Sequence, residues 1–160
     1  MASLTNMVNS MYFIIPGRLP GLNEVNDSNR THAQIGARLK RDVQSRVMWS
    51  IKKYTASGDV RPVDYPVEVT IHWYEPNRRR DVDNIQSGTK FILDAMVKLK
   101  LIPNDGQRWV RQIYHKVFKD DDGDGYVLVM VRPAPAEDEQ ALKKYAKNGD
   151  VATYVEKEGT

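Results

Sequence analysis

The chain has 160 residues, with 24 Lys and Arg against 21 Asp and Glu, and 41% of the residues are hydrophobic. These values are ordinary for one folded domain and exclude a disordered polymer. No apolar run reaches the roughly 18 residues that a membrane span needs, and the first residues lack the basic and apolar regions of a signal peptide. Cysteine is absent, which excludes disulfides, Cys-ligated zinc and Cys nucleophiles. We therefore expect a cytoplasmic protein whose chemistry uses carboxylates, lysines, arginines and hydroxyls.

Positive charge is concentrated in the first part of the chain. Segment 137–160 contains six acidic residues and four lysines, so the first 136 residues hold a net charge of +5. Segment 30–53 carries seven basic residues against Asp42 alone, and Arg78, Arg79 and Arg80 form an unbroken triplet. Such clustering favours a polyanionic partner only weakly, because basic helical faces are more often simply solvated.

Apolar periodicity predicts the elements in chain order. Segment 12–15 is an apolar run that ends at Pro16-Gly17, which indicates a buried strand. Segment 16–28 is rich in Pro, Gly and Asn and is predicted to be a loop. A helix is then predicted over 31–54, because one stripe of it is apolar: Ile35, Leu39, Val43, Val47 and Ile51.

Segment 67–74 shows the clearest period of two in the chain, which predicts a strand with one buried face. A second helix is predicted over 84–99, a turn over 103–106 and a strand over 110–118. Segment 119–125 is interpreted as a hairpin loop that joins this strand to a partner strand over 126–131. The order β-α-β-α-β-β predicts an α/β (α+β) domain, with a mixed sheet flanked by two main helices.

The predicted domain spans 11–133, because Pro133 and Pro135 close the last strand. Segment 1–10 is polar and is expected to be flexible. Segment 134–160 is expected to be a charged tail, with a helix over 137–147 and a loose remainder.

Aspartates in segment 78–105 suggest a metal site. Asp81 and Asp83 are two residues apart, so an extended backbone points both carboxylates to one side. Asp105 lies in the turn after the second predicted helix, and it reaches the other two only if that turn folds back. Three carboxylates without cysteine make an all-oxygen site that suits Mg²⁺ or Mn²⁺. Such an ion activates water for attack on a phosphodiester.

Lys90 lies on one polar helical stripe with Asp83, Ser87 and Asp94. From this stripe its ammonium group reaches toward a scissile phosphate and stabilises the charge of the transition state. The arginine triplet enters the same site and is suited to hold backbone phosphates.

Structural readings of the same residues stay open. Asp83 with Gln86 resembles a capping box, Lys90 with Asp94 is an ordinary helix pair, and Asp105 before Gly106 is a common turn. Segment 120–131 begins like an EF-hand loop, but its last ligand position is Val131, so a turn is favoured over a calcium site. Among the tryptophans, Trp73 is in phase with a buried face, and base stacking by Trp49 or Trp109 is left open.

Taken together, segment 78–105 resembles the RusA family of Holliday junction resolvases, found in phages and prophages. The shared pattern is a basic run, then D-x-D-N, a helix lysine, a D-A-L/M element, and an acidic pair before A/G-Q. It is carried here by the following residues: Arg78-Arg79-Arg80, Asp81-Val82-Asp83-Asn84, Lys90, Asp94-Ala95-Met96 and Asn104-Asp105-Gly106-Gln107. Segment 15–24 also resembles the opening of a phage-type subgroup, so the resemblance covers 12–131.

The chain departs from the pattern at two places. Lys90 comes three residues later after D-x-D-N than in the founding member, a spacing that the phage-type subgroup shares. The acidic pair is Asn104-Asp105, so only Asp105 corresponds to a ligand.

The resemblance implies a RusA-like fold and a Mg²⁺-dependent homodimer that resolves four-way DNA junctions by paired, symmetric nicks, in recombination and repair. It implies that Asp81, Asp83 and Asp105 hold the metal and that Lys90 assists at the phosphate. No membrane partner and no nucleotide cofactor are expected, and a phage-encoded protein would act in the cytoplasm of its bacterial host. The residues expected to contact DNA are Arg18, Asn23, Arg78, Arg79, Arg80 and Asn84, with the basic helix 30–53 as a weaker candidate.

Two other functions fit the sequence. A nuclease with the same site can cut flaps, forks or other branched DNA. A non-catalytic DNA-binding module would keep the arginines and need no cluster of aspartates.

Overall fold

A four-stranded mixed β-sheet forms the centre of the computed structural model, which describes residues 9–137 and 139–158. Its strands are β1 (Met11–Pro16), β2 (Val67–Glu75), β3 (Val110–Lys119) and β4 (Tyr126–Pro133). The spatial order is β1-β4-β2-β3, with β2 and β3 parallel and β4 antiparallel to both β1 and β2. The chain is therefore an α+β domain, as its pattern of elements predicts.

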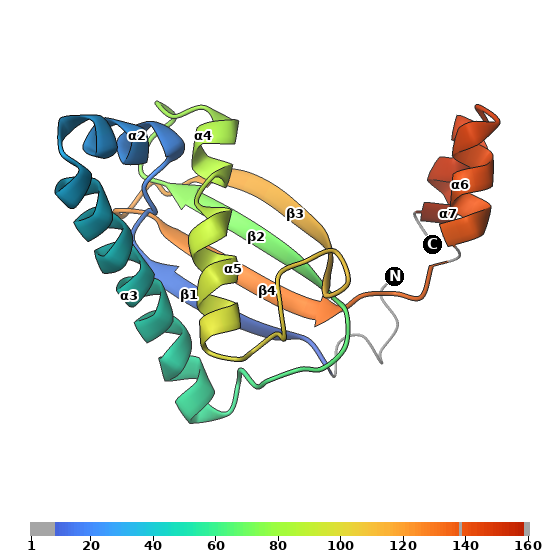
Figure 1. Cartoon of the computed structure of the whole chain (residues 1–160), viewed down its shortest axis with the longest axis horizontal. Helices are drawn as coiled ribbons and strands as arrows, with labels where there is room; N and C mark the ends of the chain where they lie inside the picture. The colour runs from blue at the N-terminus through green and yellow to red at the C-terminus, as the bar shows by residue number, and fades with distance from the viewer. Residues whose placement is uncertain (1–8, 138, 159–160) are drawn as a thin grey trace.

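The helices that follow or precede these strands cover one face of the sheet (Figure 1). They are α2 (Leu22–Thr31), α3 (Ala33–Ser57), α4 (Val82–Gln86) and α5 (Thr89–Lys98). Alternate strand residues point under them, and the fully buried core includes Phe13, Ile15, Val47, Ile51, Ile71, Trp73, Ile92, Met96 and Val129. Burying such side chains supplies most of the free energy that stabilises the fold.

The four predicted strands are confirmed, but the predicted hairpin between the last two is wrong. β2 lies between β3 and β4, so segment 119–125 crosses over the end of β2 instead of making a tight turn. β4 pairs with β1 on one side and with β2 on the other, which places its buried residues Val127, Val129 and Val131 under the helices. β3 is only half-buried along its length and occupies an edge.

The loop predicted over 16–28 is wrong in its second half, where α2 begins at Leu22. No residue of α2 is buried, so no apolar stripe marks this helix in the sequence. Contacts with Arg80 and Asn84, which are distant in sequence, hold it in place. The helix predicted over 31–54 is confirmed as α3, Ala33–Ser57.

The helix predicted over 84–99 is divided into α4 and α5 at Ser87-Gly88. A Cβ atom on Gly88 would lie 3.2 Å from the ring of Trp73 and 3.3 Å from Leu19. This close approach is tighter than most side chains allow, so Gly88 lets the break in the helix sit directly on the buried tryptophan.

The tail contains two helices, α6 (Glu139–Lys147) and α7 (Val151–Glu158), beyond one end of the sheet (Figure 1). The first confirms the helix predicted over 137–147, and the second corrects the loose segment expected after it. Arg111 at the start of β3 donates a hydrogen bond to Glu139 and so ties α6 to the sheet. The predicted flexible segment 1–10 lies mostly outside the described residues.

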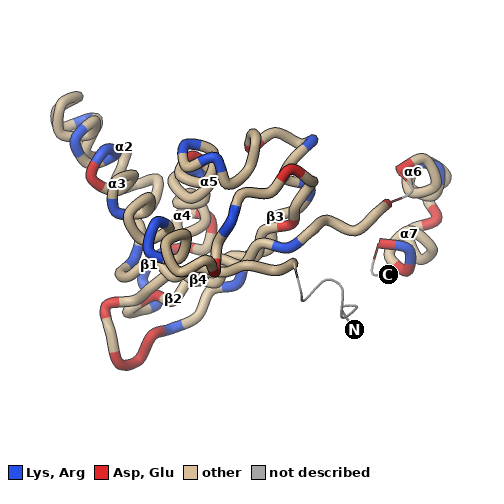
Figure 2. The backbone as a smooth tube through the Cα atoms, turned by 90° about the horizontal axis from the view of Figure 1, so that it is seen from below, with Lys and Arg blue, Asp and Glu red and all other residues tan. Residues whose placement is uncertain are grey.

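The second face of the sheet has no helix over it in the described residues, since α2 to α5 all lie on the other side (Figures 1 and 2). Aromatic and apolar side chains share this uncovered face with six polar ones. The first group is Tyr12, Ile14, Tyr74, Tyr114, Phe118, Tyr126, Leu128 and Met130, and the second is Glu68, Thr70, His72, Gln112, Lys116 and Arg132. Tyr74 stacks on Tyr126 with ring centroids 4.2 Å apart and on Phe118 at 4.8 Å. A row of stacked rings therefore crosses β3, β2 and β4. Within the described chain, no helix is long and apolar enough to cross a bilayer.

Trp73 is the largest fully buried side chain of the core, 1% exposed. Its indole N–H donates a hydrogen bond of 3.1 Å to Nδ1 of His115 on the neighbouring strand. His115 must therefore be neutral, with its proton on Nε2, for this bond to exist. Burial lowers the pKa of His115, which favours the same neutral state.

We expect the fold to lose stability in mild acid because of His115. Its folded-state pKa lies below that of the unfolded chain, so the unfolded chain binds a proton first. The stabilisation is complete above the unfolded pKa of about 6.5 and declines as the pH falls toward the folded-state value. Urea unfolding at several pH values measures this loss. His115→Asn should flatten the decline, whereas the exposed His32→Asn should not. An equal decline in wild type and His115→Asn would refute the assignment.

Candidate functional site

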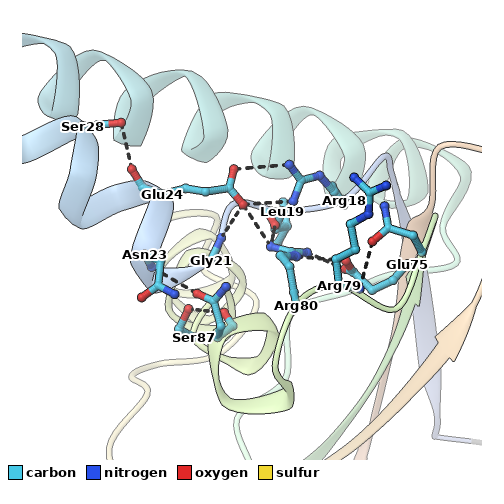
Figure 3. A network of polar contacts seen from close by, with 12 residues as sticks. Arg18, Leu19, Gly21, Asn23, Glu24, Ser28, Glu75, Arg79, Arg80 and Ser87 are labelled. Atoms are coloured by element: carbon cyan, nitrogen blue, oxygen red, sulfur yellow. Dashed lines mark hydrogen bonds and ion pairs between the residues drawn. The ribbon is translucent and has the colours of Figure 1, made fainter.

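Arg80 is the residue that joins the chain after β2 to the rest of the site (Figure 3). Its Nε donates to Glu75 Oε2 at 3.0 Å and its Nη1 donates to the carbonyl of Leu19 at 2.9 Å. Nη1 also lies 3.3 Å from Glu24 Oε1. The side chain of Arg80 is 12% exposed and that of Glu75 5%, so this ion pair is shielded from water.

Glu24 extends the same network on the side of α2. Its carboxylate accepts a hydrogen bond of 2.9 Å from Arg18 Nη1 and one of 3.4 Å from the backbone N–H of Gly21. Arg46 of α3 donates to the carbonyl of Arg18 at 2.8 Å. Loop 16–21 is therefore fixed by arginines from two other parts of the chain.

Asn84 caps helix α2 from a distance of 61 residues along the chain. The N-cap residue Gly21 has no side chain to accept from the first turn, and Asn84 Oδ1 accepts the backbone N–H of Asn23 at 3.1 Å instead. A Cβ atom on residue 21 would lie 2.3 Å from this Oδ1, so Gly21 leaves the room that the cap needs. Asn84 thus has a structural task in addition to the DNA contact predicted for it.

Asp81 and Asp83 stand at the exposed start of α4. Asp81 is the N-cap residue and has an extended backbone, φ −69° and ψ 153°. Asp83 lies in the first turn, and its Oδ1 accepts the backbone N–H of Asn84 at 2.8 Å. Both acids lie where the partial positive charge of a helix start stabilises negative charge.

Lys90 and Asp105 are brought near each other by the turn that follows α5. Lys90 Nζ donates to Asp94 Oδ1 at 2.8 Å. This hydrogen bond and the charge of Asp94 raise the pKa of Lys90, and the charge of Asp105 adds a smaller increase. Asp105 is half-buried, and Lys90 is exposed. Lys90 therefore stays cationic at neutral pH, which suits a group that neutralises a phosphate and not a general base.

The three aspartates are not gathered into one cluster. Across residues 9–137 and 139–158, no group of three or more Asp, Glu or His side chains is placed to hold a metal ion. The oxygen donors of Asp81, Asp83 and Asp105 match the chemistry that Mg²⁺ requires, but their arrangement is not that of a formed site. Like charges repel one another when no cation lies between them, which favours such a separation.

The arginine triplet is divided between two environments. Arg78 and Arg79 are exposed, whereas Arg80 points inward to Glu75. Arg18 forms an ion pair with Glu24 and stays partly exposed, and Asn23 is exposed at the start of α2. Of the predicted site residues, Arg78, Arg79 and Lys90 keep cationic groups exposed to a phosphate backbone.

Sequence reasoning missed the part that Glu75 and Glu24 play. The signal for Glu75 is its phase: it continues the buried positions of β2 after Val69, Ile71 and Trp73, and an arginine run follows it. A buried carboxylate is expected to have a cationic partner. No comparable signal marks Glu24, whose partner Arg80 is far away in sequence.

Comparison with known proteins adds no assignment. No protein-family model matches the chain, and a search of curated proteins finds no significant match.

We expect Arg80→Ala to destabilise the fold by about 3 kcal/mol, because it leaves Glu75 buried without its cation. Arg79→Ala, which removes an exposed neighbour, should change the free energy of unfolding by less than about 0.5 kcal/mol. Urea unfolding of both variants is the measurement. The double variant Glu75→Leu, Arg80→Met should recover most of the loss. Equal stability of the two single variants would show that the buried pair does not hold this loop.

Proposed function

We propose that the chain is a Mg²⁺-dependent endodeoxyribonuclease of the RusA type that resolves four-way DNA junctions. The observation that carries the proposal is that Asp81 and Asp83 are both exposed at the start of α4 and are followed, on the next helix, by the exposed cation of Lys90. These are among the residues that the resemblance to the RusA family assigns to catalysis. The exposed Arg78 and Arg79 beside them supply cations for a phosphate backbone.

In this proposal Asp81, Asp83 and Asp105 would hold the metal. When bound, Mg²⁺ supplies a Lewis acid for the phosphodiester and lowers the pKa of a water molecule. The separation of the three carboxylates requires that the cation itself brings them together. The turn that carries Asp105 lies outside the helices and strands, and its neighbours Pro103, Asn104 and Gly106 are exposed, which suits a segment that moves toward a cation.

Lys90 acts through its charge. Like any exposed lysine it is protonated at neutral pH, and the hydrogen bond to Asp94 raises its pKa further, so its charge neutralises a phosphate oxygen and stabilises the charge that develops in the transition state. Asp94 positions this side chain through the hydrogen bond to Nζ. Arg80, committed to Glu75 and Leu19, positions the loop and the start of α4 instead of contacting DNA.

A homodimer is part of the proposal, since a single site cannot nick two opposed strands. The uncovered face of the sheet is the surface proposed for the second copy, because the aromatic side chains of Tyr12 and Tyr114 are exposed on it and no helix covers it. Both candidate sites would then face outward, since they lie on the helical side. Sedimentation as a monomer at micromolar concentration would remove the paired nicks from the proposal.

A non-catalytic DNA-binding module is the second candidate. It is favoured by the exposure of Arg78 and Arg79, which can hold a phosphate backbone without any metal. Such a module would use the same exposed arginines, and neither Asp81 nor Asp83 would matter for what it does.

A synthetic four-way junction distinguishes these functions. We expect nicking in Mg²⁺ and none in EDTA, with a loss of at least about 100-fold for Asp83→Asn. Asparagine keeps an oxygen that can accept the N–H of Asn84, so α4 should stay folded. Junction binding should persist or tighten, because the variant removes negative charge. Asp122→Asn, an exposed acid in the 119–125 loop, is the matched control and should cleave normally.

Three outcomes would overturn parts of this proposal. Binding without any cleavage in Mg²⁺ or Mn²⁺ would favour the DNA-binding module. Equal cleavage of a junction, a flap and plain duplex would remove junction specificity. Unimpaired cleavage by Asp83→Asn would remove the proposed metal site.

A further inference from the structure

A pocket of about 690 Å³ lies between helices α2 and α3 on one side and α5, with Ser87 just before it, on the other. Its volume falls within the range of about 300–1,000 Å³ that encloses small ligands. Lys90, proposed above to act at the scissile phosphate, is one of its lining residues. The pocket therefore adjoins the candidate active site but extends away from the aspartates, toward α3.

The lining combines apolar and cationic side chains. The apolar contribution comes from Leu22, Val25, Met48 and Phe91, with Pro20 from the loop before α2. The cations are Lys40, Arg41, Lys90 and Lys98, and the only acidic lining residue in the described structure, Asp94, is already paired with Lys90. A ligand that matches this lining has a flat or apolar body with attached negative charge.

We propose that this pocket takes one unpaired nucleobase of the bound DNA strand. The ring system contacts the apolar walls around Phe91, and the flanking phosphates lie near Lys40, Arg41 and Lys98. Aromatic and apolar side chains next to a base contribute affinity without sequence preference, and cations hold the backbone on either side. The inference rests on the proposed function only in taking DNA as the partner.

The pocket gives a physical basis for a preference for branched DNA. A base in a duplex must unpair and unstack before it enters a protein pocket, which costs free energy, and this cost is least for a base that is already unpaired. The base pairs at a branch point lack a stacking neighbour on one side, so a base there unpairs and unstacks at lower cost than one inside a plain duplex. A single base pocket beside Lys90 would therefore favour branched substrates over duplex without any contact that reads sequence.

The test is binding in EDTA to a labelled duplex with one bulged nucleotide, compared with the same duplex carrying an abasic bulge. Wild type should bind the base-containing bulge about tenfold more tightly. Ser45→Leu narrows the pocket at an exposed lining position and should reduce this ratio to near one. Ala56→Leu, exposed on the same helix but outside the lining, is the matched control and should keep the ratio.

A second pair of variants tests the cationic side chains of the lining. Arg41→Ala should weaken binding of both bulged duplexes, whereas Arg38→Ala, on the same helix but paired with Asp42, should weaken it less. Equal losses would indicate only general attraction of a basic helix for DNA and would count against the pocket. Equal binding of base-containing and abasic bulges by wild type, or an unchanged ratio in Ser45→Leu, would overturn the inference.

These outcomes are separable from the fate of the nuclease. A base preference without cleavage would support the base-binding pocket and overturn the nuclease proposal. Cleavage without a base preference would support the nuclease proposal and overturn the base-binding pocket.

Discussion

The buried ion pair of Glu75 with Arg80 is the interaction on which the arrangement of the site depends. Glu75 ends the central strand β2 inside the core, and Arg80 turns back to meet it while also holding the carbonyl of Leu19 and the carboxylate of Glu24. Two segments that are far apart in sequence, loop 16–21 and the start of α4, are thereby fixed to the end of one strand. Asp81 and Asp83 follow directly, so their position is set by a network that contains neither of them.

The same region shows why buried charge is tolerated here. Each guanidinium and carboxylate group in the network has a partner, and no buried side-chain nitrogen or oxygen in the described residues is left without a hydrogen bond. A buried ion pair contributes little net stability when compared with apolar residues, but removal of one partner is costly. The network therefore contributes more to fixing the position of the loop than to the stability of the fold. Precise positioning of nearby groups is what a catalytic or binding site requires.

Much of the fold could be predicted because burial follows simple periods. Val67 to Trp73 alternate at a period of two, and the stripe from Val43 to Ile51 repeats at helical spacing, so β2 and α3 appear in the sequence. The strand order could not be predicted in this way, since period alone does not say which neighbours a strand takes. Helix α2 depends on its cap by Asn84, and the break at Gly88 depends on the packing of Gly88 against Trp73; in each case the partner is distant in sequence. The same holds for the candidate site. The residue types and their spacing can be found in the sequence, but the inward turn of Arg80 and the separation of the aspartates depend on contacts in the folded chain.

Mn²⁺ binding measured by electron paramagnetic resonance shows whether Asp81, Asp83 and Asp105 close around a divalent cation, as proposed. We expect saturable binding that Mg²⁺ displaces and that Asp105→Asn weakens strongly, while the exposed loop variant Asp124→Asn retains it. If wild type shows no saturable binding, or if Asp105→Asn binds equally well, the three carboxylates do not form a metal site.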